Sequence, residues 1–333
     1  MAVTLADVAK RAGVSVATAS RVLNNKMVMP IPPTTVARIK QAAEELQYLP
    51  NAIARALATG KTRTLGLYSQ EMTDPHFAQM LEAAEAKARS LGFHLIVSST
   101  LEEVSWRGRV DGIVALGAPD QPQFEGLADR LSTVFVFHAS QPKPNLVAWS
   151  DEEGMYLATR HLLELGHRKI AALFCYGEER SQPKVAGFRR AIAEEGAESI
   201  ECWQAYKTDQ TIHGNQFENG YRSVQQLCQE RRDFTGLVAR NDFLALGALR
   251  ALRAAGAVVP EDVSVIGYTD SIHAVCADPP LTSVRTPIAE AGEMAIERLV
   301  RSIEGKEADF EGVLLPTTLT VRHSCAPPSE RAR

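Results

Sequence analysis

Three small hydroxyl side chains and an arginine lie close together near the start of the chain, in the stretch "GVSVATASRVLN": Ser15, Thr18, Ser20 and Arg21. Hydroxyl groups can donate hydrogen bonds to phosphate oxygens, and arginine can donate two parallel hydrogen bonds to the edge of a guanine. The small side chains of Val16 and Ala17 would let a helix approach a groove closely. This chemistry suits double-stranded DNA, although an ordinary helical hairpin with a polar face would show the same pattern.

The spacing of apolar residues predicts two short helices that would position these groups. Thr4 can cap the first helix, with Asp7 as its capping-box partner three positions later. Gly13 suits a left-handed turn, and Ser15 can cap the second helix. The second helix would turn three apolar residues inward: Ala19, Val22 and Leu23. Two helices joined in this way form a helix-turn-helix pattern.

A third helix is predicted after the proline-rich stretch "MPIPPTT". Pro33 suits its first turn. Its buried stripe would consist of Val36, Ile39, Ala43 and Leu46. Asn51 can cap a further short helix that reaches Leu57, which is too short to be stable alone in water. Residues 59–62, "TGKT", then indicate a linker.

Charge is distributed unevenly along the chain. Residues 1–64 hold nine basic and three acidic residues, a net charge of +6, whereas the rest of the chain carries −10. A basic segment on an acidic body is expected to meet a polyanion. The five cysteines are widely spaced and form no CxxC motif, which indicates reduced thiols in the cytoplasm. With no 18-residue apolar run and no signal-peptide pattern, we expect no membrane segment.

From Thr64 onward, strands and helices are predicted to alternate, which implies parallel sheets and an α/β fold class. The expected strands are "TLGLYS", "FHLIVSS", "VDGIVALG", "TVFVFH", "LVAWS", "KIAALFC", "GLVAR" and "VSVIGY", with helices at 75–91 and 154–165. No G-x-S-x-G, phosphate-binding loop or H-E-x-x-H motif is present. We therefore expect neither an enzyme nor a metal or cofactor site.

Polar and aromatic residues at the carboxyl ends of these strands could bind a small ligand, because open α/β sheets bind ligands at that edge. The candidates are Asp74, Phe77, Trp149, Lys184, Asn241, Asp242 and Asp270. Carboxylate and amide groups can bond to hydroxyls, and a tryptophan can cover the apolar side of a sugar ring, so the set favours a polyhydroxylated ligand. Two alternatives stay open: Asn241 and Asp242 can simply cap a helix, and Trp149 can be a core residue.

The quoted opening and "YLPNAIARALATG" resemble the headpiece and hinge helix of the LacI/GalR family of bacterial transcription regulators, and "GVSVATASRVLN" is especially similar to the galactose-repressor branch. The resemblance continues through "TDPHF", "LLELGHRKIAAL", "NDFLALGALRALRAAGAVVPEDVSVIGYTD" and "PPLTSVR", in the family's order. It implies a repressor that binds a palindromic double-stranded DNA operator as a homodimer and responds to a sugar-like effector. It also implies a cytoplasmic, nucleoid-associated location.

The resemblance implies three parts: a helix-turn-helix DNA-binding domain at 1–50, a hinge helix and linker at 51–62, and an effector-binding and dimerisation domain at 63–327. The last part would resemble a periplasmic sugar-binding protein with two lobes, an N-lobe at about 63–149 and 280–308 and a C-lobe at about 150–279 and 309–327. The residues expected to contact DNA are Thr4, Leu5, Ser15, Val16, Ala17, Thr18, Ser20, Arg21, Asn24, Thr35, Asn51, Ala54 and Leu57. The chain would cross between lobes near Ser150 and near Pro279 and Pro280.

Four features depart from the family pattern. Lys184 stands where many sugar-binding members have arginine, and Thr269 replaces the first of two consecutive aspartates. Pro32 replaces the usual hydroxyl cap of the third headpiece helix, although Thr35 remains. Only residues 100–109 separate two of the expected strands, where the family fits a full helix, and a parallel crossover usually needs a dozen or more residues. We expect at most a two-turn helix there.

A different class of function stays open. A periplasmic-type sugar-binding or sensing module could carry an N-terminal helical hairpin without any DNA function. Such a module would lack a secretion signal and would leave the +6 charge of the first 64 residues unexplained. Salt-dependent binding to palindromic DNA separates the two hypotheses.

Overall fold

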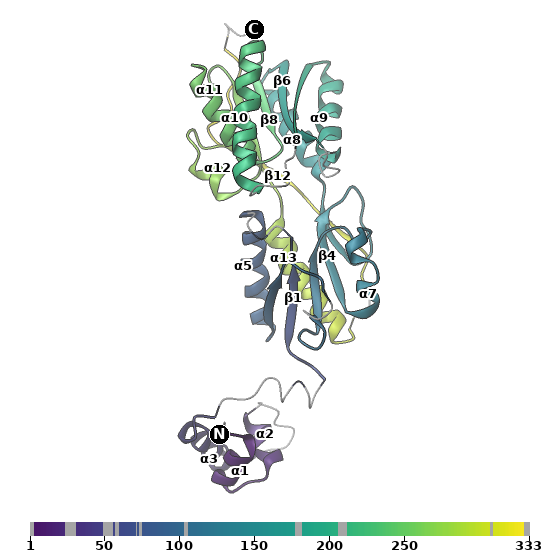
Figure 1. Ribbon diagram of the computed structural model, residues 1–333, viewed down its shortest axis with the longest axis vertical. Helices are drawn as coiled ribbons and strands as arrows, with labels where there is room; N and C mark the ends of the chain where they lie inside the picture. The colour runs from purple at the N-terminus through teal and green to yellow at the C-terminus, as the bar shows by residue number, and fades with distance from the viewer. Residues whose placement is uncertain are drawn as a thin grey trace. The chain divides into compact units, whose positions relative to one another are not determined.

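The structure is a computed structural model that describes residues 3–23, 31–48, 56, 60–70, 72, 75–102, 106–176, 182–205, 212–306 and 309–329. The chain forms two compact units, a headpiece of residues 1–63 and a body of residues 64–333 (Figure 1). The headpiece is all-helical in its described residues, whereas the body contains two mainly parallel sheets covered by helices. The predicted fold class is therefore confirmed.

The headpiece contains α1 (Leu5–Ala12), α2 (Val16–Leu23) and α3 (Pro33–Glu45). Its core takes buried residues from all three helices: Val8, Ala9, Ala12, Ala19, Val22, Ile39, Ala42 and Ala43. The predicted turn between α1 and α2 is confirmed, because Gly13 has a φ of 64° and its N–H donates to the carbonyl oxygen of Lys10 at 3.2 Å. Glycine suits this left-handed conformation because it has no β-carbon. The turn sets the angle at which α2 leaves α1.

The N-lobe of the body is a six-stranded parallel sheet in the order β11-β5-β4-β3-β1-β2. Its strands are β1 (Thr64–Tyr68), β2 (His94–Ser98), β3 (Gly112–Leu116), β4 (Thr133–His138), β5 (Leu146–Trp149) and β11 (Val313–Leu315). Helices α5 (Pro75–Ser90) and α13 (Ile288–Ile303) pack on one face of this sheet. Two short elements, η1 (Pro122–Phe124) and α7 (Leu127–Arg130), contribute to the core on the other face.

The C-lobe is a second six-stranded sheet in the order β12-β10-β9-β8-β6-β7, parallel except for the β10–β12 pair. Its strands are β6 (Lys169–Tyr176), β7 (Glu198–Ala205), β8 (Gly236–Ala239), β9 (Ser264–Thr269), β10 (Thr282–Arg285) and β12 (Thr318–Thr320). One face carries α8 (Asp151–Glu164) and α9 (Gln182–Glu195), and the other carries α10 (Ile212–Glu230) and α11 (Asp242–Ala254). The short helix α12 (Ile272–Cys276) follows β9.

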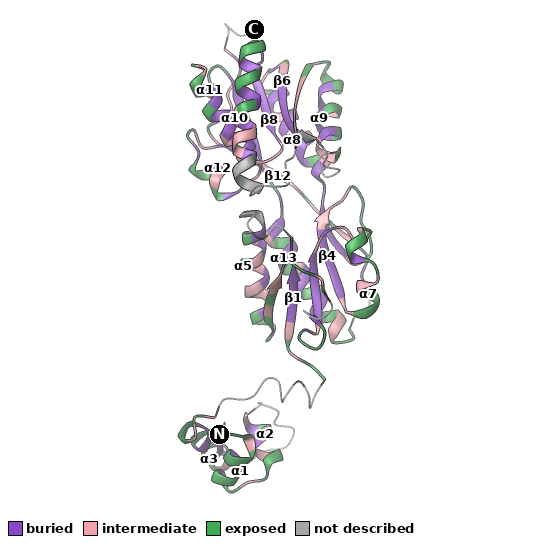
Figure 2. Cartoon of the chain, in the orientation of Figure 1, coloured by how far each residue is buried: buried purple, intermediate pink, exposed green. Residues whose placement is uncertain are grey.

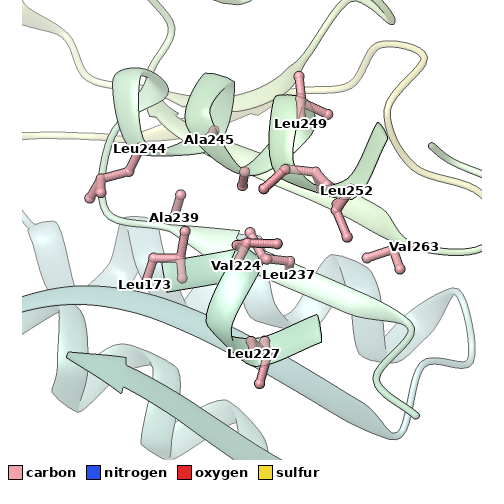
Figure 3. Close-up of a cluster of buried hydrophobic side chains, with 14 of the residues drawn as sticks. Leu173, Val224, Leu227, Leu237, Ala239, Leu244, Ala245, Leu249, Leu252 and Val263 are labelled. Carbon is pink, nitrogen blue, oxygen red and sulfur yellow. The ribbon is translucent and has the colours of Figure 1, made fainter. Parts of the chain in front are cut away.

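Apolar burial explains this layering. The central strands of both sheets are buried, while the outer faces of the helices are exposed (Figure 2). On one face of the C-lobe, Leu237 and Ala239 of β8 pack against Leu244 and Leu252 of α11 and Val224 of α10 (Figure 3). Strands buried on both faces are typical of parallel sheets with helical crossovers.

The described strands show where the chain crosses between the lobes. The first crossing lies at Ser150, as predicted. The second follows Arg285, so the predicted crossing near Pro279 and Pro280 is wrong: β10 pairs with β9 in the C-lobe, and only α13 returns to the N-lobe core. A third crossing separates β11 from β12. Residues 313–315 therefore belong to the N-lobe, which corrects the assignment of 309–327 to the C-lobe.

The short crossover between β2 and β3 depends on one aromatic side chain. Leu101 and Glu102 are not helical and residues 107–109 form a turn, which excludes a three-turn helix and confirms the prediction. The side chain of Trp106 is 3% exposed and packs into the core of the sheet face that a longer helix would cover. Its Nε1 donates to the carbonyl oxygen of Thr100 at 3.0 Å.

Candidate functional site

The outward face of α2 presents the side chains that the sequence singled out. Val16, Ala17 and Arg21 are exposed, whereas Ala19 and Val22 are buried in the headpiece core. The side chain of Val16 is 48% exposed although it is apolar. A helix face with small apolar groups and a guanidinium group can approach base edges and donate to them.

Hydroxyl groups fix the start of α2. Ser15 Oγ accepts a hydrogen bond from Thr18 N at 3.1 Å and lies 2.8 Å from Thr18 Oγ1, so the predicted cap is confirmed. Thr18 and Ser20 are half-buried at the edge of the exposed face. The cap satisfies one of the free N–H groups at the helix start and thereby orients the exposed residues that follow.

The start of α1 is fixed by the predicted capping box. Asp7 N donates to Thr4 Oγ1 at 3.4 Å, while Asp7 Oδ2 accepts from Thr4 Oγ1 at 2.7 Å and from Thr4 N at 2.9 Å. These hydrogen bonds from Thr4 lower the pKa of Asp7 because they stabilise its carboxylate. Leu5 is half-buried against the headpiece core. Thr35 N donates to Pro32 O at 2.9 Å in the first turn of α3, where no side chain caps the helix.

Several predicted contact residues lie outside the described residues: Asn24, Asn51, Ala54 and Leu57 of the DNA-binding set, and Asp74 of the ligand set. Phe77 is described, and it is 5% exposed within the N-lobe core. Its packing is therefore that of a core residue at the start of α5.

Two of the predicted ligand residues, Trp149 and Lys184, meet at a carboxylate that the sequence did not single out. Trp149 Nε1 donates to Asp151 Oδ1 at 3.1 Å, and Lys184 Nζ lies 3.0 Å from Asp151 Oδ2. The hydroxyl of Tyr268 donates to Asp151 Oδ1 at 2.9 Å, and Lys184 Nζ also lies 4.1 Å from the centroid of the Tyr268 ring. His138 Nδ1 lies 3.9 Å from Asp151 Oδ2.

The charge of Asp151 is retained in spite of its burial. Burial acts to raise the pKa of Asp151, but the charges of Lys184 and His138 and the hydrogen bonds from Lys184 and Tyr268 outweigh it and lower the pKa to about 2. Burial, together with the neighbouring carboxylate, raises the pKa of Tyr268 well above its usual range. At neutral pH this group is therefore a buried ion pair with a phenol and an indole as hydrogen-bond donors.

Close packing of glycines positions this group. A β-carbon at Gly154 of α8 would overlap the hydroxyl of Tyr268, and a β-carbon at Gly187 of α9 would overlap the carbonyl of Glu152. Ser150 caps α8 by accepting a hydrogen bond from Glu153 N at 3.1 Å, so α8 begins earlier than the predicted residue 154. The cap places Asp151 in the first turn, directly after strand β5.

The remaining candidates form a second group at the ends of β8, β9 and β10. Asn241 Oδ1 accepts from Leu244 N at 2.9 Å, so Asn241 caps α11, the alternative that the sequence left open beside ligand binding. Asp242 is 1% exposed and accepts four hydrogen bonds, from Thr269 Oγ1 (3.1 Å), Ser271 N (2.8 Å), Ser271 Oγ (2.8 Å) and Ser283 Oγ (2.7 Å). Burial raises the pKa of Asp242 against the effect of these bonds. Asp242 therefore organises the loop ends around it.

Asp270 is engaged in the same region. Its Oδ1 lies 2.7 Å from Arg322 Nη2, and its Oδ2 accepts from Thr320 Oγ1 at 2.9 Å. Thr269 and Asp270 have φ values of 104° and 54°. Positive φ is costly for residues with a β-carbon and persists where surrounding bonds hold it, as those of Asp242 and Arg322 do here.

The structure thus brings Trp149 and Lys184 together, and separately brings Asn241, Asp242 and Asp270 together. Sequence reasoning missed Asp151 and Tyr268. Both had the signal used for the other candidates: Asp151 is the second residue after strand "LVAW", and Tyr268 lies at the end of "VSVIGY".

Two regions of the chain match known families. Residues 4–51 match "Bacterial regulatory proteins, lacI family", and residues 159–325 match the "Periplasmic binding protein-like domain". The HTH-type transcriptional regulator DegA of Bacillus subtilis (strain 168) is 33% identical in an alignment of 346 positions, gaps included. The alignment covers 98% of this chain and 99% of DegA.

Two solved structures have a fold similar to that of this chain over nearly its whole length. A lac repressor dimer bound to operator and the anti-inducer ONPF is similar with a TM-score of 0.84 and 27% identity, covering 98% of this chain and 100% of that one. The complex of the transcriptional regulator CelR with cellobiose has a TM-score of 0.66 and 29% identity, covering 97% and 99%.

No helix in the described part of the chain is both long and apolar enough to cross a membrane. The similarity to DegA extends over nearly the whole of both chains, headpiece and body alike. We conclude that the chain belongs to the lacI family of bacterial regulatory proteins and is a DNA-binding transcriptional regulator, not an enzyme.

Proposed function

We propose that this regulator binds a palindromic operator as a homodimer, represses transcription there, and is controlled by a small sugar-like effector bound in the body. The observation that carries the DNA-binding part is the exposed face of α2, on which Val16, Ala17 and Arg21 stand clear of the headpiece core. A dimer would place two such faces on two half-sites related by the same symmetry. The proposed site of action is the nucleoid in the cytoplasm.

Arg21 would specify a base, while Val16 and Ala17 would define the half-site by close apolar contact. The proposed phosphate contacts are Thr18, Ser20, Asn24 and Thr35, with Thr4, Leu5 and Ser15 at the adjoining helix starts. In the hinge, assigned to residues 51–62, Leu57 would wedge between base pairs in the minor groove, with Asn51 and Ala54 beside the backbone. Unstacking a base step costs a few kcal/mol, which the contacts of bent DNA offset.

A pairing surface is available on the C-lobe. Ile272 and Val275 of α12 are 61% and 51% exposed and lie one helical turn apart, so they form a small exposed apolar patch. In the N-lobe, α13 turns most of its apolar residues into the core of its own lobe: Ile288, Ala291, Ala295, Ile296, Leu299 and Val300. We therefore assign the apolar part of the pairing surface to α12, with the exposed side of α13 as its polar part.

The proposed effector site lies at the carboxyl ends of the C-lobe strands and at β5, around Trp149, Lys184, Asn241, Asp242 and Asp270. Asp74 and Phe77 stay further candidates from the sequence. Hydrogen-bonding groups beside an indole suit a polyhydroxylated ligand. Lys184 and Asp270 already have ionic partners in Asp151 and Arg322. The effector would thus exchange hydrogen bonds with these pairs, and its preference among sugars would differ from that of relatives with arginine and paired aspartates.

The test is selection of bound DNA from a random pool by the full chain, followed by affinity measurements at several salt concentrations. We expect palindromic sites and a log–log salt slope of several units, because each neutralised phosphate contributes about −0.9 to the slope. Binding to no DNA, or equal binding to selected and random DNA, would support a sensing module without a DNA function. Thermal-shift screening with sugars and sugar acids would then identify the effector.

A further inference from the structure

One buried carboxylate receives hydrogen-bond donors from both lobes. Asp151 is 4% exposed and lies immediately after the first crossing between the lobes. Trp149, which donates to Oδ1, ends strand β5 of the N-lobe. Tyr268, which donates to the same oxygen, lies in β9 of the C-lobe, and Lys184 of α9 pairs with the other oxygen. The two oxygens therefore join three secondary-structure elements to α8.

A second group from the N-lobe faces the same carboxylate. His138 ends β4, and its Nδ1 is 3.9 Å from Asp151 Oδ2, the oxygen that Lys184 also approaches. The parallel register places His138 beside Trp149 across strands β4 and β5. Rotation of the N-lobe about the first crossing would move His138 and Trp149 together, relative to Lys184 and Tyr268.

The cost of an unpaired buried charge means that such a rotation would switch Asp151 between distinct sets of partners. Removing one partner of a buried ion pair leaves an uncompensated charge and is strongly destabilising, so the group must keep its partners or exchange them. Lys184 and Trp149 are also the residues assigned to the effector. A ligand that takes a hydrogen bond from either side chain competes directly with Asp151. A bond lost from Trp149 is one that joins the lobes, whereas a bond lost from Lys184 leaves His138 of the N-lobe beside the oxygen that both approach.

We propose that Asp151 is a positioning residue that couples effector binding to the arrangement of the lobes, holding Trp149 of the N-lobe and Lys184 of the C-lobe to one carboxylate. This inference rests on the proposed function, since the arrangement of the lobes matters only if it sets the spacing of the DNA-binding headpieces. Asp151 does not itself need to contact the effector. When a hydrogen bond at Lys184 or Trp149 is lost or gained, Asp151 changes its partners, and the arrangement of the two lobes changes with it.

The experiment compares the full-length wild type with Asp151→Asn, Lys184→Met and the double variant, on a palindromic operator selected with the wild type and on random DNA. Both single variants should change the operator-to-random affinity ratio in the same direction by at least about fivefold, the lower end of allosteric coupling. The double variant should change it no more than the larger single effect, because both substitutions break one group. Trp149→Phe, which removes the indole N–H donor and keeps a smaller aromatic ring, should act in the same direction.

Glu201→Gln is the matched control. It breaks an ion pair within the C-lobe, Glu201 with Arg189 at 2.7 Å, and should leave the ratio unchanged. A merely structural role for Asp151 would lower the melting temperature without changing the ratio, and that result would overturn the inference. If Asp151→Asn does not fold, an unchanged ratio in both Lys184→Met and Trp149→Phe overturns it equally. A wild type that selects no DNA would remove the proposed function and this inference with it.

Discussion

The indole of Trp106 lies directly over Gly66 in the N-lobe sheet. A β-carbon at Gly66 would overlap the ring, with Cε3 only 2.7 Å away. Gly66 lies in β1, between β2 and β3, so it offers the ring a flat area of backbone. The pair explains how a crossover of so few residues covers this face: one large aromatic side chain takes the space that a helix fills elsewhere.

The contact between Gly66 and Trp106 predicts that a change at one residue offsets part of the stability lost by a change at the other. Gly66→Ala should lower the free energy of unfolding of the body by about 1–3 kcal/mol, because overpacking forces the ring or the strand to shift. Trp106→Phe removes the ring atoms that the new methyl would overlap. The double variant should therefore lose less stability than the sum of the two single variants, as measured by urea denaturation. Additive losses would mean that the two residues do not share this space.

Arg21→Ala should reduce the affinity for the selected operator by about 1–3 kcal/mol, with most of the loss at one base pair. The reason is that Arg21 is exposed on the same face of α2 as Val16 and Ala17. Lys40→Ala is the control, since it removes the same charge from an exposed position of α3. Competition between single-base operator variants and random DNA measures the effect. An equal loss on all sequences would make Arg21 a phosphate contact.

His167 should make the stability of the body depend on pH. Its ring is buried, with Nδ1 2.8 Å from Thr235 Oγ1 and Nε2 3.0 Å from the carbonyl oxygen of Ala326. Burial lowers the pKa of His167 to about 4, from 6.5 in an unfolded chain. Between these values the unfolded state binds more protons, so the free energy of unfolding falls as the pH falls, by at most about 1.4 kcal/mol per pH unit. Above pH 6.5 this contribution is fully present.

Urea denaturation between pH 7 and pH 4.5 measures this dependence. His167→Gln should flatten it, whereas His94→Gln, at an exposed position of β2, should not. The contribution of Asp151 falls in a different window, because its lowered pKa of about 2 affects stability only below about pH 4. An unchanged slope in His167→Gln would mean that other groups cause the acid sensitivity.

The exposed apolar residues of α12 predict the effect of charge at the pairing surface. Ile272→Asp with Val275→Asp should convert the dimer to a monomer at micromolar concentration, because two carboxylates would lose their hydration on pairing. Leu157→Asp on α8 is the control, since Leu157 is also exposed but lies on another helix. Sedimentation velocity separates the two outcomes. A double variant that remains dimeric would place the pairing surface elsewhere.

In the hinge, Leu57→Ala should abolish most operator-specific binding while effector binding to the body is retained. A wedge that unstacks a base step contributes only on the bent operator, so affinity for random DNA should change little. Binding measurements and a DNA-bending assay on the same operator test this. Unchanged affinity and bending would mean that the hinge is only a tether between headpiece and body.

Local patterns were sufficient for the headpiece. The capping box of Thr4 and Asp7, the left-handed Gly13 and the cap at Ser15 all depend on residues a few positions apart, so their spacing carries the information. The same holds for the eight strands predicted in the body, because their apolar runs can be recognised in the sequence without knowing which strands pair. The shortness of residues 100–109 likewise limited the helix that could form there.

Non-local partners decided the rest. Whether β10 and β11 join one sheet or the other depends on strands far away in sequence, so the predicted second and third crossings were both misplaced. The partners of Asp242 and Asp270 come from loops brought together by the sheet order. Asp151 shows the same limit most clearly: its position after a strand was visible, but only the folded chain brings Lys184 and Tyr268 to its buried carboxylate, where desolvation makes each partner matter.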